Sequence, residues 1–100
     1  MNHNEFIESL KSATPPKDLG GEELALWYAA KDDWEMAHNT AQEISTETAS
    51  WIHAYLHRWE GDISNSRYWY HRAQKEAYSE SLEEELEDII HSIFSKCQKK

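Results

Sequence analysis

Glycine, proline and cysteine are all scarce in this chain, which holds three, two and one of them in 100 residues. Runs of alternating Val, Ile and Thr are absent as well, so the sequence gives no support for β-strands. The single cysteine, Cys97, excludes an internal disulfide bond and is typical of a protein from a reducing compartment. Together these shortages predict an all-α domain.

Basic residues are also few, because ten Lys and Arg stand against nineteen Asp and Glu and give a formal net charge of −9. Such a charge repels phosphate backbones, so we expect no nucleic-acid partner. No apolar run approaches the ~20 residues that a transmembrane helix needs. The polar start, MNHNEFIESL, lacks the pattern of a secretion signal. We therefore expect no membrane partner and a cytoplasmic location.

The residues that are present favour six helices in one domain. Apolar residues make up 39% of the chain and include five tryptophans, so a few large side chains must supply much of the core. Apolar side chains recur every three or four residues between the breaks at Pro15-Pro16, Gly20-Gly21, Asp32-Asp33 and Gly61. The helices are expected over residues 4–12, 22–31, 34–44, 47–60, 62–77 and 81–98.

An internal repeat groups these helices into pairs. The segment DDWEMAHNTAQ, from Asp32, aligns with GDISNSRYWYHRA, from Gly61, at an offset of 29 residues. The second segment resembles the second helix of a tetratricopeptide repeat, which implies stacked hairpins that present a binding surface. Tetratricopeptide units repeat at about 34 residues, usually in three or more copies. We therefore expect an N-terminal helix with a proline linker (1–16), two hairpins (22–44 and 47–77) and a closing amphipathic helix (81–98).

A second resemblance covers 40 of the 100 residues. The segments LWYAAKDDWEMAHNTAQ (Leu26–Gln42) and WIHAYLHRWEGDISNSRYWYHRA (Trp51–Ala73) resemble a group of short bacterial proteins of uncharacterised function. The resemblance implies a helical fold and a bacterial, cytosolic setting. It implies no catalytic residue, and we expect no cofactor.

The candidate ligand residues with the most regular spacing lie on the fourth expected helix. His53 and His57 are four residues apart and Glu60 follows three later, so all three lie within about 60° around the helix axis. Two imidazoles and a carboxylate on one face are a possible divalent-metal site, to which His38 or His71 can be brought by folding. The alternative is a solvated polar face opposite Tyr55 and Trp59.

Two further places can bind a ligand. On the fifth helix Tyr68 lies off the apolar stripe with His71 and Arg72, an arrangement suited to an anionic or planar ligand. The alternative is that Tyr68 packs on the last helix or on the neighbours of Trp69. On the third helix His38 and Gln42 flank the buried stripe, where a histidine more often bonds a neighbouring turn than takes part in catalysis.

The last two helices carry apolar stripes that are expected to be buried. These stripes are Ile63, Ser66, Tyr70, Ala73 and Ala77 on the fifth helix, and Leu82, Leu86, Ile89, Ile93 and Cys97 on the sixth. The acidic run Glu83–Asp88 is expected to be the solvated, dipole-compensating start of the sixth helix rather than a cation site. Ile90 and Phe94 widen its stripe, so a homodimer that buries the ends of the stack is as plausible as a monomer.

These patterns predict a non-enzymatic binding or adaptor module for a protein, a peptide or a small ligand. Its candidate surface comprises His38, Gln42, His53, His57, Glu60, Tyr68, His71 and Arg72. The alternative is a metal- or histidine-dependent enzyme that uses His53, His57 and Glu60.

Overall fold

Six helices build the protein in the computed structural model, which describes residues 1–95. They are α1 (His3–Ser9), α2 (Gly21–Ala30), α3 (Trp34–Ala41), α4 (Glu47–Trp59), α5 (Ile63–Arg72) and α6 (Leu82–Ser95). No strand occurs within those 95 residues, so the predicted all-α class is confirmed. In the same part of the chain, no helix combines the length and the apolar character required to cross a bilayer.

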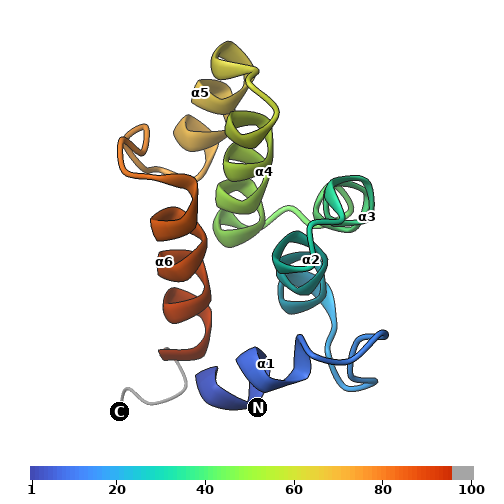
Figure 1. The fold of residues 1–100 in the computed structure, drawn as a ribbon. Helices are drawn as coiled ribbons and strands as arrows, with labels where there is room; N and C mark the ends of the chain where they lie inside the picture. Colours follow the sequence, from blue (N-terminus) through green and yellow to red (C-terminus); the bar gives the residue numbers. More distant parts are fainter. Residues whose placement is uncertain (96–100) are drawn as a thin grey trace.

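The helices are arranged around α4, which lies at the centre of the molecule (Figure 1). α2 packs against α3, and α4 packs against α5. A short turn joins the two helices of each pair. α6 runs beside α4, while α1 crosses one end of the molecule between α6 and α2 (Figure 1). The site described below lies where α3 meets α4.

The two turns that join the helix pairs have the same geometry. Asp33 and Asp62 each cap the following helix, and each of their backbone amides donates to a carbonyl five residues earlier, at 2.9 Å and 2.8 Å. The residues before them, Asp32 and Gly61, have φ angles of 65° and 91°, which is the left-handed C-terminal end of a helix. Every equivalent position is offset by 29 residues, as in the aligned sequences. The local backbone therefore agrees with the internal repeat, while tetratricopeptide-like stacking stays a prediction.

The fifth helix is shorter than the sequence indicates. α5 ends at Arg72 instead of Ala77, because Gln74 adopts φ 61° and the amide of Lys75 donates to the carbonyl of Tyr70 at 3.0 Å. The chain then leaves the helix, so Ala77 is exposed and does not extend the apolar stripe. The expected burial of Ile63 is also wrong, since 47% of this residue is exposed at the start of α5. α3 likewise ends at Ala41 and α1 at Ser9.

The core is made by large side chains from five of the six helices. The largest fully buried apolar ones are Trp27, Tyr70, Phe6, Phe94, Leu26, Ile52, Leu56 and Ile89. Phe6 of α1 stacks on Phe94 of α6 with 4.9 Å between ring centroids, so the short first helix covers the end of α6. Ile89, Ile90 and Ile93 are buried within the chain as well. The homodimer stays a prediction, although Phe6 of α1 covers part of the surface that it would bury, while Leu82 and Leu86 of α6 are only half-buried. Cys97 lies outside the described residues.

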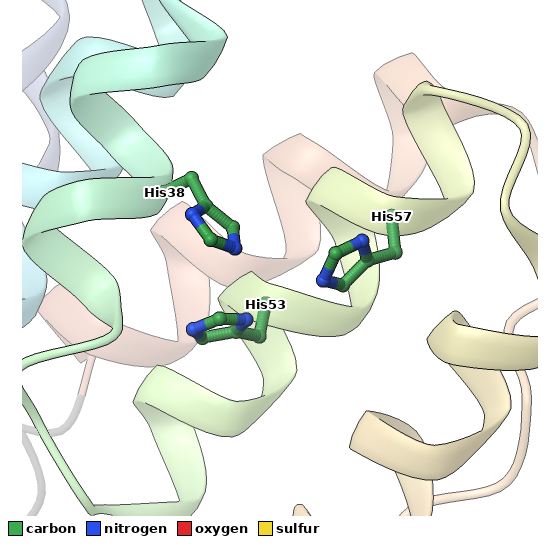
Figure 2. Close-up of side chains that lie close together, drawn as sticks. All are labelled: His38, His53 and His57. Atoms are coloured by element: carbon green, nitrogen blue, oxygen red, sulfur yellow. The ribbon is translucent and has the colours of Figure 1, made fainter.

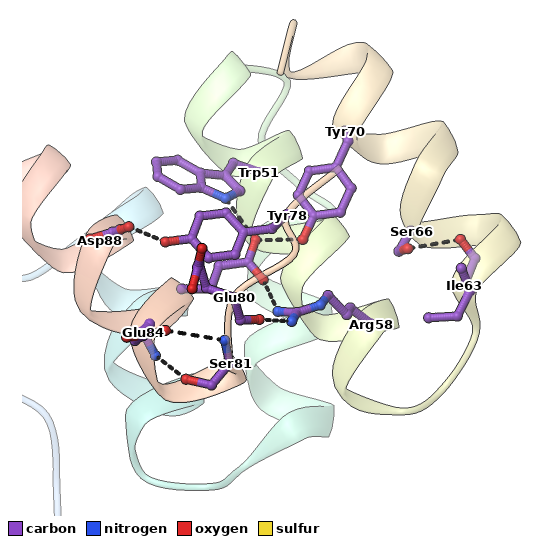
Figure 3. A network of polar contacts seen from close by, with 11 residues as sticks. Trp51, Arg58, Ile63, Ser66, Tyr70, Tyr78, Glu80, Ser81, Glu84 and Asp88 are labelled. Carbon is purple, nitrogen blue, oxygen red and sulfur yellow. Dashed lines mark hydrogen bonds and ion pairs between the residues drawn. The ribbon is translucent and has the colours of Figure 1, made fainter. Parts of the chain in front are cut away.

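Glu85 overturns the prediction that the acidic run Glu83–Asp88 is solvated throughout, because its side chain is 0% exposed. Its carboxylate accepts hydrogen bonds from Trp51 Nε1 at 2.9 Å and Tyr70 Oη at 2.5 Å, and pairs with Arg58 at 2.7 Å (Figure 3). Arg58 also donates to the backbone carbonyl of Glu80 (Figure 3). A buried carboxylate is tolerated only with such partners. The cluster ties α6 to α4 and α5.

Candidate metal centre

Three imidazole rings meet between α3 and α4. His53 and His57 are one turn apart on α4, and His38 points toward them from α3 (Figure 2). The centroid of the His38 ring lies 4.7 Å from that of His53 and 5.4 Å from that of His57, and the two α4 rings are 5.7 Å apart. One nitrogen from each ring falls within 4.8 Å of the other two. Packing of α3 on α4 thus completes a group that the α4 spacing only begins.

His38 reaches this position because Trp34 anchors α3 to α4. The Trp34 indole nitrogen donates to the carbonyl of Leu56 at 2.7 Å, and the indole ring stacks on His38 with 4.8 Å between centroids and 8° between planes. The two residues are one helical turn apart, so they share a face of α3. His38 is half-buried, and its imidazole ring forms no hydrogen bond with a neighbouring turn among the described residues.

His53 is the most unusual of the three. Only 3% of it is exposed, and its ring stacks on Trp69 of α5 with centroids 4.0 Å apart. Neither Nδ1 nor Nε2 has a hydrogen-bond partner in the part of the chain that the structure describes. Buried polar atoms are nearly always paired, because leaving one without a partner costs about 1–3 kcal/mol. The two nitrogens of His53 therefore require an explanation.

His57 is held in one orientation by the residue at the end of its own helix. Its Nδ1 lies 2.8 Å from Oε2 of Glu60, while 7% of His57 is exposed. When the Nδ1–H group donates a hydrogen bond to that carboxylate, Nε2 keeps a free lone pair, and a metal-binding histidine is commonly oriented in this way. Glu60 therefore positions His57 and is not a member of the three-histidine group.

The protonation states follow from burial. Desolvation lowers the pKa of His53 to about 4, and the neighbouring charges of His38, His57 and Arg72 act in the same direction. Burial also lowers the pKa of His38, with His57 adding to the effect and Glu60 opposing it. Both rings are therefore neutral at pH 7, which is the form that donates a lone pair to a metal ion.

The arrangement suits an ion that prefers nitrogen ligands. Around a tetrahedral ion with Zn–N distances of 2.0–2.1 Å the nitrogens lie roughly 3.3 Å apart, so the rings must close by up to roughly 1.5 Å. A second group, His57, Glu60 and Asp62, also has atoms within 4.8 Å of one another. Its two carboxylates are exposed, and that of Asp62 already caps α5. The three-histidine group is the better candidate.

The burial of His53 and His57 contradicts the alternative that they form a solvated polar face. The other candidate residues lie outside the cluster. Tyr68 is 52% exposed, and its hydroxyl accepts a hydrogen bond from Arg72 at 3.2 Å. His71 and Gln42 are exposed and belong to neither metal-type group among the described residues.

Two aromatic walls of the site were not identified in the sequence. Trp34 stacks on His38, and Trp69 stacks on His53. The sequence pattern indicated only that both tryptophans are apolar core residues. The pair Trp34 and His38, spaced four residues apart, was the available signal for the first wall. Nothing local connects Trp69 to His53, because their stacking depends on the packing of α5 on α4.

Comparison of the chain with protein-family models, with curated proteins and with solved structures finds no match. The resemblances to tetratricopeptide repeats and to short bacterial proteins therefore stay predictions.

Proposed function

We propose that this protein is a non-enzymatic binding module whose ligand is a divalent transition-metal ion such as Zn²⁺, held by His38, His53 and His57. The observation that carries the proposal is the pair of buried, unpartnered nitrogens of His53. A metal ion on one of them removes part of the cost of burying an unpaired polar atom, and the other two rings supply the remaining protein ligands.

The donor set indicates which class of ion fits. Neutral imidazole binds Zn²⁺, Cu²⁺, Ni²⁺ and Co²⁺, whereas Mg²⁺ and Ca²⁺ prefer oxygen ligands. The site lies between two helices that are each fixed by other contacts, namely the Trp34–Leu56 hydrogen bond and the Glu85 cluster. Its ligands are therefore held near one another before the ion binds, which lowers the ordering cost of binding.

Binding is favoured over catalysis because of the position of Glu60. A metal hydrolase needs a free carboxylate or imidazole to move protons beside the ion. Here the Glu60 carboxylate contacts His57 Nδ1 at 2.8 Å, and thus acts on a ligand and not on a substrate. The metal- or histidine-dependent enzyme is the less supported reading.

Visible absorption of Co²⁺ tests the proposal directly, because tetrahedral nitrogen coordination gives an intense visible band. The titration is made at pH 7.5 in a Cys97→Ser background, since a thiolate is itself a good ligand for these ions. We expect a stoichiometric band that Zn²⁺ displaces, and a weakening of at least about tenfold in His38→Gln and in His57→Gln.

The matched control is His71→Gln, which removes an exposed imidazole from α5 and leaves the cluster unchanged. A band of equal strength in all three variants refutes the site. Absence of any Co²⁺ or Zn²⁺ binding at micromolar concentration also refutes the site.

A further inference from the structure

A groove of about 260 Å³ opens on the side of α4 away from the histidines. Tyr55 and Trp59 line it, two residues beyond His53 and His57 and thus roughly 200° around the helix axis from them. Leu82 and Leu86 of α6 form a second wall. The groove and the three-histidine group share no residue.

The rim of the groove is acidic. Asp32, in the turn after α2, and Glu83, in the first turn of α6, both line it. Neither carboxylate forms an ion pair with any residue that the structure describes, and none of the groove's described lining residues is basic. Elsewhere the chain places an ammonium group on an aromatic ring, since Lys75 Nζ lies 4.1 Å from the centroid of Trp51. Among residues 1–95, no Lys or Arg pairs with Asp32 or Glu83 or lies over the ring of Tyr55 or Trp59.

Tyr55 gives an independent indication of a ligand. It is 5% exposed and lines the groove, and its hydroxyl, which makes no hydrogen bond with a described residue, is open to the groove and not sealed in the core. Its oxygen therefore has a lone pair free to accept a hydrogen bond from a ligand in the groove.

We infer that this groove binds an organic ammonium ion, that is, a cationic nitrogen on an apolar carbon chain. The carbon chain lies against Leu82 and Leu86, and the nitrogen lies between the two carboxylates and the rings of Tyr55 and Trp59, whose centroids are 6.0 Å apart. Aromatic faces beside carboxylates are the usual surroundings of bound ammonium groups, because the ring quadrupole and the negative charge both attract the cation. The oxygen of Tyr55 accepts one of its N–H bonds.

A ¹H–¹⁵N NMR titration with n-butylammonium tests the inference, with EDTA present so that the result is independent of the metal site. The neutral analogue 1-butanol shares the carbon chain and lacks the charge. We expect butylammonium to shift the amide signals of residues 55–59 and 82–86, with binding that weakens as salt is added. We expect 1-butanol to bind at least about fivefold more weakly.

Variants identify which carboxylates and which aromatic ring contribute to binding of the cation. Asp32→Asn and Glu83→Gln should each weaken butylammonium binding about two- to fivefold, and Asn tolerates the left-handed conformation of residue 32. Trp59→Leu should weaken it further, while Glu35→Gln on α3 is the control for loss of one negative charge. N-acetyl-lysine methylamide distinguishes the source of the cation, because tighter binding than butylammonium indicates a lysine side chain of a protein and weaker binding a free amine.

Equal binding of butylammonium and 1-butanol overturns the inference and leaves an apolar crevice. Shifts that do not map to the groove, or affinities that are unchanged in both Asp32→Asn and Glu83→Gln, overturn it equally.

Discussion

Replacement of His53 by phenylalanine should make the metal-free protein more stable. The substitution keeps an aromatic ring against Trp69 and removes both nitrogens that lack a partner. A buried polar side chain without hydrogen-bond partners costs about 1–3 kcal/mol, so a gain of about this size in the free energy of unfolding is expected at pH 7.5. For a domain of this length, each 1 kcal/mol raises Tm by about 4–8 °C.

Zinc should cancel most or all of this difference between the two proteins. A ligand that binds only the folded state contributes about 2.7 kcal/mol at a hundredfold excess over its Kd. The wild type should therefore gain about this much on addition of Zn²⁺, while His53→Phe, with one ligand removed, should gain little. The variant is expected to be the more stable protein in EDTA and to lose that advantage in zinc.

Thermal melts followed by circular dichroism, with EDTA or with Zn²⁺, measure both effects, and His71→Gln is the matched control. His53→Leu is a second variant, since its smaller side chain avoids overpacking against Trp69. Lower stability of both variants in EDTA shows that the nitrogens of His53 are satisfied in solution and refutes the reasoning. A zinc-induced rise in Tm that is equal in wild type and variants refutes the metal site alone.

Three further predictions concern stability. Glu85→Ala should lower the free energy of unfolding, measured by urea titration, by about 3–5 kcal/mol, because Arg58 and two other donors lose their acceptor. An effect below about 1 kcal/mol contradicts the buried cluster. The pKa of His53 is about 4 in the folded protein and ordinarily 6.5, so the unfolded chain takes up the proton first as pH falls. The free energy of unfolding of the metal-free protein should therefore fall by about 3 kcal/mol between pH 6.5 and pH 4. The same dependence on pH in His53→Phe assigns the loss to other groups. Gly61→Ala should lower the free energy of unfolding by about 1–2 kcal/mol in thermal or urea unfolding, since φ is 91° at that position. An unchanged stability contradicts the left-handed turn.

The sequence by itself determined the features that depend on neighbours along the chain. The left-handed residue at Gly61, the caps at Asp33 and Asp62 and the 29-residue offset between the two turns all follow from local backbone chemistry. The four-residue spacing of His53 and His57 likewise places both rings on one face of any helix that contains them. Such patterns say which residues share a face.

Only the tertiary structure decided what each face meets. Periodicity predicted that Glu85 is solvated, but the packing of α6 on α4 buries it. Periodicity also predicted that Ile63 is buried, but it lies at the end of the α4–α5 pair and is exposed. His38 joins the α4 histidines for the same kind of reason, because a Trp34 hydrogen bond fixes α3 across α4. Contacts between residues far apart in the chain depend on how helices cross, and helical spacing within one segment carries no information about that crossing.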